Sequence, residues 1–150
     1  MMKYVALAAA SLMIFSLLSY TFYSDVRALE RIKVEIKDVT IRQILPDMVL
    51  GISLQFINEA GREIRNMGGD IDVYILDEWV GKLNFSGLNI DGHSYQEIEI
   101  PLTLYYEHLT KSIVQAINEM NFNLSIKGII KGKVLFGLVD YKVPVMAKWE

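Results

Sequence analysis

A charge-free hydrophobic segment near the N-terminus constrains this chain more than any other feature. It runs from Tyr4 to Tyr23, YVALAAASLMIFSLLSYTFY, twenty residues without Asp, Glu, Lys or Arg. Because a helix rises ~1.5 Å per residue, such a segment covers the ~30 Å hydrocarbon core of a bilayer. We therefore predict one transmembrane helix over residues 4–23, with the lipid bilayer as its partner. Its predicted anchor residues are Tyr4, Leu12, Ile14, Phe15, Leu17, Leu18, Tyr20, Phe22 and Tyr23.

Two other interpretations of this segment are a cleaved signal peptide and a helix lying in the membrane interface. The best cleavage site, Val26-Arg27-Ala28, is far downstream of the apolar region and contains an arginine, which does not suit signal peptidase. An interfacial helix needs a strongly polar face, and this segment offers only serines and a threonine. The sequence favours a retained signal anchor.

The side of the membrane on which the rest of the chain lies is a separate question. Only Lys3 precedes the segment, whereas several basic residues follow it, so a positive-inside count alone would keep the domain in the cytoplasm. Those basic residues alternate with apolar ones in a predicted strand, and a short N-terminal tail before a long domain is typical of an uncut export signal. We expect a single-pass membrane protein with an extracytoplasmic domain.

The remainder of the chain has the size and composition of one folded domain, which we place at residues 29–150. Of the 150 residues, 52% are hydrophobic and 22% charged, which is enough apolar surface for a core. The formal net charge of −3, with no basic block, argues against nucleic acid as a partner. The absence of cysteine excludes disulfides, thiolate zinc sites and a cysteine nucleophile.

Period-two alternation dominates the domain. In the first predicted strand, Ile32, Val34 and Ile36 alternate with charged residues, as a half-buried strand requires. Similar patterns predict further strands at 48–56, 71–75, 80–85, 98–104, 122–126, 134–136 and 138–149, with a long polar connection over 58–69 and a pause over 128–132. Pro144 should place the centre of the last strand at a sheet edge or a bulge. Seven or so short strands at hairpin spacings predict a mainly β fold in the form of a sandwich.

One segment departs from this pattern and predicts a helix between Glu107 and Asn121. Its apolar residues recur at helical spacing and its opposite face is polar, so one side should pack on the sandwich. This predicted face, which would serve either as core or as one wall of a slot for an apolar ligand, consists of Leu109, Ile113, Ala116, Ile117 and Met120.

From about Leu29 to the C-terminus the chain resembles the late embryogenesis abundant type-2 family, also called water stress and hypersensitive response (WHy) domains. The resemblance lies in the order of four motifs: LERIKVEIKDVTIRQI, Phe56-Ile57-Asn58, IEIPLTLYYEHL with its Ile100-Pro101-Leu102-Thr103, and IKGIIKGKVLFGLVDYKVPV with its Pro144-Val145. The chain departs from the family in two places: it reads NEAGREIRNMGG from Asn58 onward, where relatives have a proline-rich turn, and it has Glu107 at the helix cap. The resemblance implies a seven-stranded immunoglobulin- or fibronectin-III-like sandwich with a helix at one end. It also implies a non-enzymatic role in desiccation or other stress.

The residues themselves point to no catalytic or metal chemistry. His93 and His108 have no second ligand at metal spacing, and Asp70 with Asp72 is better explained as a solvated strand face. The sequence contains no phosphate-binding glycine loop and no Gly-x-Ser-x-Gly elbow. We therefore expect no enzyme activity, no metal and no cofactor.

Two Asn-x-Ser sequons begin at Asn84 and Asn123. Both asparagines fall on the polar phase of a predicted strand, and they would matter only in a glycosylating compartment.

Three functions are compatible with these patterns. The leading hypothesis is a membrane-anchored protective or interaction domain of the stress-associated type, with an unspecified protein or lipid ligand. The second is carriage of a lipid or other apolar ligand between the helix and the sheet. The third is a subunit of a surface filament assembled through the hydrophobic N-terminal helix.

Overall fold

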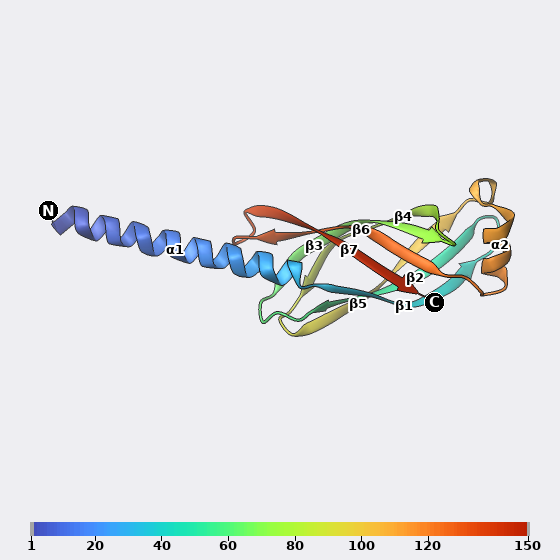
Figure 1. Ribbon diagram of the computed structural model, residues 1–150, viewed down its shortest axis with the longest axis horizontal. Coiled ribbons are helices and arrows are strands. Elements are labelled where there is room, and N and C mark those ends of the chain that lie inside the picture. The colour runs from blue at the N-terminus through green and yellow to red at the C-terminus, as the bar shows by residue number, and fades with distance from the viewer. Residues whose placement is uncertain (1, 150) are drawn as a thin grey trace.

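A computed structural model describes residues 2–149 and consists of one long helix followed by a β-sandwich (Figure 1). The helix projects away from one end of the sandwich, and a short helix closes the other end. The elements in chain order are α1 (Met2–Glu30), β1 (Lys33–Gln43), β2 (Met48–Asn58), β3 (Ile64–Ile75), β4 (Glu78–Ile90), β5 (Ser94–Leu104), the 3₁₀ turn η1 (Tyr106–His108), α2 (Lys111–Asn118), β6 (Leu124–Val134) and β7 (Val139–Trp149).

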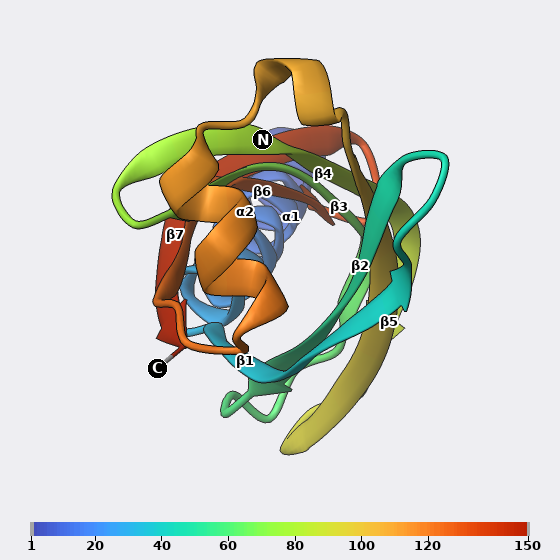
Figure 2. The same cartoon turned by 90° about the vertical axis from the view of Figure 1, so that its right-hand side faces the viewer.

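The strands form two antiparallel sheets, which confirms the predicted mainly β sandwich. One sheet has the order β1-β2-β5 and the other β4-β3-β6-β7. Contacts between β4 and β5 on one side and between β1 and β7 on the other bring the two sheets together at their edges (Figure 2). Pro101 and Pro144 lie in the edge strands β5 and β7, where a missing backbone donor is tolerated, so the expectation for Pro144 is confirmed.

The core lies between the sheets and follows from the alternation seen in the sequence. In β2, Met48, Leu50, Ile52, Leu54 and Phe56 are all 0% exposed, because alternate residues of a strand point to one face. Apolar residues of the other six strands and of both helices belong to the same cluster. Fully burying one such aliphatic or aromatic side chain contributes roughly 1.5–3 kcal/mol, so this single face of β2 is a major source of stability.

Two stretches expected to lie outside strands are strands in the structure. Half of the expected connection over 58–69 belongs to β3, in which Ile64 and Met67 are buried, and only residues 59–63 separate the strands. The alternation was hidden by register shifts between Ile64 and Gly69 and by the positive φ of Asn66. The expected pause over 128–132 is part of a continuous β6, in which Gly128 permits close approach to β3: a Cβ there would lie 2.2 Å from the Asp70 carbonyl oxygen.

The expected helix over 107–121 is shorter than the apolar spacing indicated. The chain first forms the separate turn η1, and α2 then spans only Lys111–Asn118. Thr110, not Glu107, is the N-cap, because its Oγ1 accepts a hydrogen bond of 3.3 Å from the Ile113 N–H. A threonine cap immediately before an apolar periodic segment stops the helix from extending toward residue 107.

Helix α1 continues without a break past Tyr23, where the apolar segment ends, to Glu30. It is exposed along most of its length, yet Ala28 and Leu29 are each only 1% exposed. The Leu29 side chain lies over Gly132 of β6, where a Cβ would meet Leu29 Cδ2 at 2.6 Å. The end of the helix is thus part of the sandwich core rather than a flexible linker.

Candidate functional site at the junction of helix and sandwich

The most organised polar region of the molecule is the end of the sandwich from which α1 emerges. Three connections gather there: β2–β3 (59–63), β4–β5 (91–93) and the β6–β7 hairpin turn (135–138). Figure 1 shows that these turns face the direction in which α1 projects, and that α2 and the C-terminal strand end are at the opposite end. These three turns are therefore the part of the sandwich that lies nearest to the apolar part of α1.

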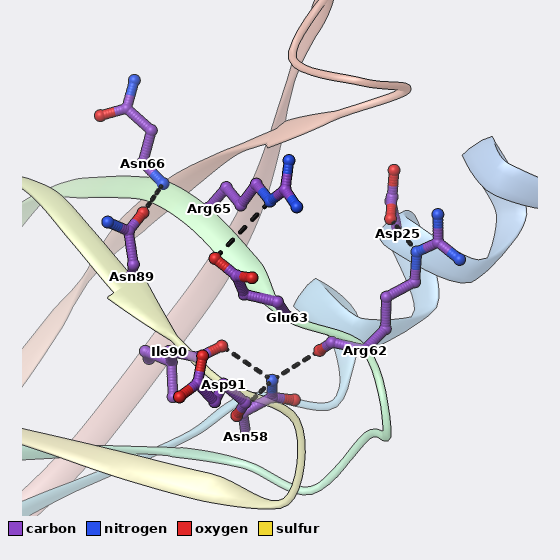
Figure 3. A network of polar contacts seen from close by, with 9 residues as sticks. All are labelled: Asp25, Asn58, Arg62, Glu63, Arg65, Asn66, Asn89, Ile90 and Asp91. Carbon is purple, nitrogen blue, oxygen red and sulfur yellow. Dashed lines mark hydrogen bonds and ion pairs between the residues drawn. The ribbon is translucent and has the colours of Figure 1, made fainter.

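Asp25 connects α1 to two of these turns, and Figure 3 shows its contact with Arg62 in the β2–β3 turn. Its Oδ1 accepts a hydrogen bond from Arg62 Nε in the β2–β3 turn, and its Oδ2 accepts one of 2.8 Å from the backbone N–H of Leu135 in the hairpin turn. The Asp25 side chain is only 13% exposed, against 38% for Arg62. A carboxylate shielded this far from water binds its charged and backbone donors more strongly than an exposed ion pair would.

Asn58 holds the β2–β3 and β4–β5 turns together (Figure 3). It is 1% exposed, and its Nδ2 donates to the carbonyl oxygens of Arg62 (2.7 Å), Ile90 (3.3 Å) and Asp91 (3.2 Å). Its Oδ1 accepts from the Ala60 N–H at 3.1 Å. One buried amide therefore lies within hydrogen-bond distance of three carbonyl oxygens and accepts from one backbone N–H, so it joins the two turns.

The stem of the β6–β7 hairpin carries a further set of charged contacts. Lys133 and Asp140 are register partners, with Lys133 Nζ 2.5 Å from Asp140 Oδ1. The hydrogen bond from Lys133 lowers the pKa of Asp140 below its ordinary value of 3.8. The Tyr141 hydroxyl donates to Glu30 Oε1 at 2.9 Å, and this bond to a carboxylate raises the pKa of Tyr141. The first contact holds the two strands of the hairpin stem together, and the second connects the stem to the last residue of α1.

The predicted anchor residues form the exposed surface of α1. Helix α1 is long and apolar enough to cross a membrane, and a signal sequence near the N-terminus would have the same properties. The exposed fractions are 78% for Tyr4, 67% for Leu12, 60% for Ile14, 70% for Phe15, 60% for Leu17, 37% for Leu18, 66% for Tyr20, 39% for Phe22 and 59% for Tyr23. Apolar surface exposed on this scale is costly in water.

The predicted helix face is only partly available to a ligand. Ile113, Ala116 and Ile117 are buried in the core of the sandwich, whereas Met120, beyond the end of α2, is 51% exposed. Leu109 precedes the helix and is partly buried. The face thus packs against the sheets as a core element.

The two predicted glycosylation asparagines, Asn84 in β4 and Asn123 before β6, are both exposed. Within residues 2–149, no group of three His, Cys, Asp or Glu side chains is arranged to hold a metal ion. Asp72 accepts a hydrogen bond of 3.1 Å from Trp79 Nε1, which gives this strand-face carboxylate a structural contact.

The sequence patterns did not reveal Asp25, Arg62 or the turn 135–138 as members of one site. Two signals were present: Asp25 is the first acidic residue after the apolar segment, and residues 134–139, VLFGLV, are charge-free between Lys133 and Asp140. Asp25 follows the end of the predicted helix at Tyr23, and the predicted strands 134–136 and 138–149 include most of the turn. Nothing in the spacing of these residues relates positions 110 residues apart.

Comparison with known proteins identifies the fold. No family model matches the chain, and neither does any curated protein. Among solved structures, the solution structure of an Arabidopsis thaliana protein is similar at 12% identity and a TM-score of 0.55, over 78% of each chain. A Northeast Structural Genomics Consortium target is similar at 10% identity and a TM-score of 0.50, over 80% of this chain and 89% of that one.

The structural neighbours also include a protein assigned provisionally to the late embryogenesis abundant proteins, at 12% identity and a TM-score of 0.49, over 95% of this chain and 84% of that one. At these identities the likeness shows the fold alone.

Proposed function

We propose that this chain is a non-enzymatic, membrane-anchored domain of the stress-associated type, in which α1 holds one end of the sandwich at a bilayer surface. The observation that carries the proposal is that α1 has an exposed apolar part and an end that is packed into the sandwich. Its apolar length is exposed as far as Tyr20, while its last turns are locked into the sandwich by Asp25, Ala28 and Leu29. A helix built in this way transmits the position of the membrane directly to the domain.

The same contacts support retention of α1 over its removal as a signal peptide. Cleavage after Ala28 would delete the carboxylate that binds Arg62 and the Leu135 N–H, and would leave Leu29 at a free end. The sandwich would then expose Gly132 and the surrounding apolar surface, which Leu29 covers.

The experiment that tests anchoring uses the full chain in cell membranes. We expect it to stay in the membrane pellet after an alkaline wash and to keep the mass of the uncut chain. The double variant Leu12→Lys/Phe15→Lys should release it, because two charges in the hydrocarbon core are strongly unfavourable. Leu76→Lys, which changes an exposed leucine in the distant β3–β4 turn, is the matched control and should stay in the pellet. A soluble chain beginning after residue 23 would contradict the proposal.

The stress role rests on the resemblance of the four ordered motifs to the late embryogenesis abundant type-2 family. Cells that lack the gene should survive drying, salt or heat less well than the parent. The full chain should restore survival, and the Leu12→Lys/Phe15→Lys chain should not. Unchanged survival on loss of the gene would contradict this part of the proposal while leaving the anchor intact.

A second candidate function, carriage of an apolar ligand, is favoured by one cleft. The facing edges of β4 and β5 enclose about 630 Å³ near Leu109, with Trp79 and Tyr105 in its walls at 59% and 51% exposure. This cleft, rather than the packed face of α2, would be the binding site. Mass spectrometry of gently purified full chain should then show a co-purifying lipid, and its absence would contradict carriage.

A further inference from the structure

The β6–β7 hairpin turn has an unusual composition for an exposed turn. Residues 134–139 are Val-Leu-Phe-Gly-Leu-Val, and Phe136 and Leu138 are 64% and 77% exposed. Exposed turns normally use polar residues and glycine, because these satisfy their own backbone and cost little in water. Two large apolar side chains at a turn tip are a common sign of a surface that meets an apolar partner.

The backbone conformation of this turn is also unusual for apolar residues. Leu135 and Phe136 have φ of 54° and 58°, in the left-handed region that glycine or asparagine would occupy at lower cost. Only the third position, Gly137 with φ of 82°, has the residue that such a conformation favours. Leu135 and Phe136 therefore occupy positions where their backbone conformation costs more than that of glycine would. This cost points to a role for their apolar side chains.

The position of the turn identifies the partner. The hydrogen bond from the Leu135 N–H to Asp25 holds the turn against α1 only two residues beyond Tyr23, the last residue of the apolar segment. Phe136 also forms one wall of a hollow of about 290 Å³ that Asp25 and Lys133 help to line. Figure 1 shows the hairpin extending alongside α1, farther in its direction than the other two turns.

We propose that residues 135–138 dip into the same bilayer that α1 crosses and form a second membrane contact. The proposal rests on the anchoring function proposed above. Phe136 and Leu138 enter the boundary between headgroups and acyl chains, where aromatic and aliphatic side chains are favourable. Lys131, Lys133 and Lys142 on the stem lie at the level of the headgroups, where long basic side chains can extend toward phosphate.

A second contact changes what the anchor does. One helix alone would let the sandwich rotate about the helix axis and tilt against the membrane. Contacts at α1 and at the hairpin tip define the orientation of the sandwich, so that the 59–63 and 91–93 turns face the headgroups and the α2 end faces water.

The test measures the depth of single indoles in the full chain, reconstituted in phosphatidylcholine vesicles with brominated acyl chains. The native Trp79 and Trp149 are replaced by phenylalanine, and one tryptophan is introduced by Phe136→Trp. The matched control is Leu76→Trp, since Leu76 is also an exposed apolar residue at positive φ, 52°, but in the β3–β4 turn at the far end. Phe22→Trp reports the anchor itself.

We expect bromine quenching of the indoles at positions 22 and 136 and none at position 76, with aqueous iodide giving the reverse order. Quenching at 22 but not at 136, with equal iodide access at 136 and 76, would overturn the hairpin contact and leave the anchor standing. Failure of the chain to float with the vesicles, or no quenching at 22, would overturn the anchoring function as well. Protection of position 136 from both quenchers would overturn the bilayer as partner and indicate a second copy of the chain.

Discussion

Asp25 of the N-terminal helix and Leu135 of the β6–β7 hairpin, 110 residues apart, are joined by a hydrogen bond of 2.8 Å from the Leu135 backbone N–H to Asp25 Oδ2. Because the other carboxylate oxygen accepts from Arg62, one side chain connects the helix to two turns of the sandwich. The end of α1 is therefore fixed to both the β2–β3 turn and the β6–β7 turn through this one carboxylate.

Replacing this carboxylate should loosen the junction. We expect Asp25→Ala to lower the free energy of unfolding by about 1.5–3 kcal/mol, the range for hydrogen bonds to charged groups, and to speed hydrogen exchange at the Leu135 amide. The control, Glu63→Ala, removes a carboxylate that is 39% exposed and 3.6 Å from Arg65, so its effect should stay within about 0.5 kcal/mol. Urea unfolding of the full chain in detergent, with amide exchange by mass spectrometry, measures both. Equal effects of the two variants would show that Asp25 is only a surface charge.

Removing the buried amide of Asn58 should lower the free energy of unfolding more than removing an exposed amide does. Asn58→Ala leaves three carbonyls and the Ala60 N–H without their partner, and should cost about 1–3 kcal/mol, toward the upper end. Asn89→Ala is the control, because exposed Asn89 accepts one hydrogen bond of 2.8 Å, from the Asn66 N–H; its loss should cost less than about 1 kcal/mol. Chemical denaturation compares the two, and a smaller loss for Asn58→Ala than for Asn89→Ala would refute its role in joining the turns.

The α2 face offers a direct test of core against ligand slot. Ile117 is 0% exposed, so Ile117→Ala should destabilise the domain by about 2–5 kcal/mol through lost burial and a cavity. Met120→Ala, at 51% exposure, should change stability by no more than about 0.5 kcal/mol. Thermal unfolding of both variants provides the measurement. A stable Ile117→Ala protein would mean that this side chain lines a slot and not the core.

The contact between Lys133 and Asp140 in the hairpin stem predicts that the stability of the domain depends on pH in the acid range. The hydrogen bond from Lys133 lowers the pKa of Asp140 below 3.8, so the folded state prefers the ionised carboxylate. The resulting stabilisation is fully present well above the unfolded value of about 3.8 and is lost as the pH falls through the lower folded value. An NMR titration of the Asp140 carboxyl carbon should give a midpoint below 3.8.

Lys133→Met should move that midpoint back toward 3.8, because it removes the largest cause of the shift. Lys148→Met, which removes an exposed lysine from the far end of β7, is the control and should leave it in place. If Lys133→Met leaves the titration midpoint of Asp140 unchanged, the ion pair does not persist in solution.

Local patterns were sufficient for most of the fold. The alternation of Met48, Leu50 and Ile52 predicts a strand and its buried face, and the structure confirms both, because a strand places alternate residues on one side whatever it pairs with. The sequence was misleading where a tertiary contact disturbs the local pattern. Gly128 resembles a break in a strand, yet it lies within β6, because only glycine fits against the backbone of β3 there.

What the sequence by itself determined is the class of the protein: an apolar helix of membrane-spanning length and a two-sheet domain, since hydrophobic length and periodicity are properties of neighbouring residues. Only the tertiary structure decided how the two parts join. The helix extends to Glu30, Leu29 packs on Gly132, and Asp25 accepts from Arg62 and Leu135. These partners lie far apart along the chain, and their meeting depends on the sheet order and register that bring the hairpin beside α1, which no local spacing encodes.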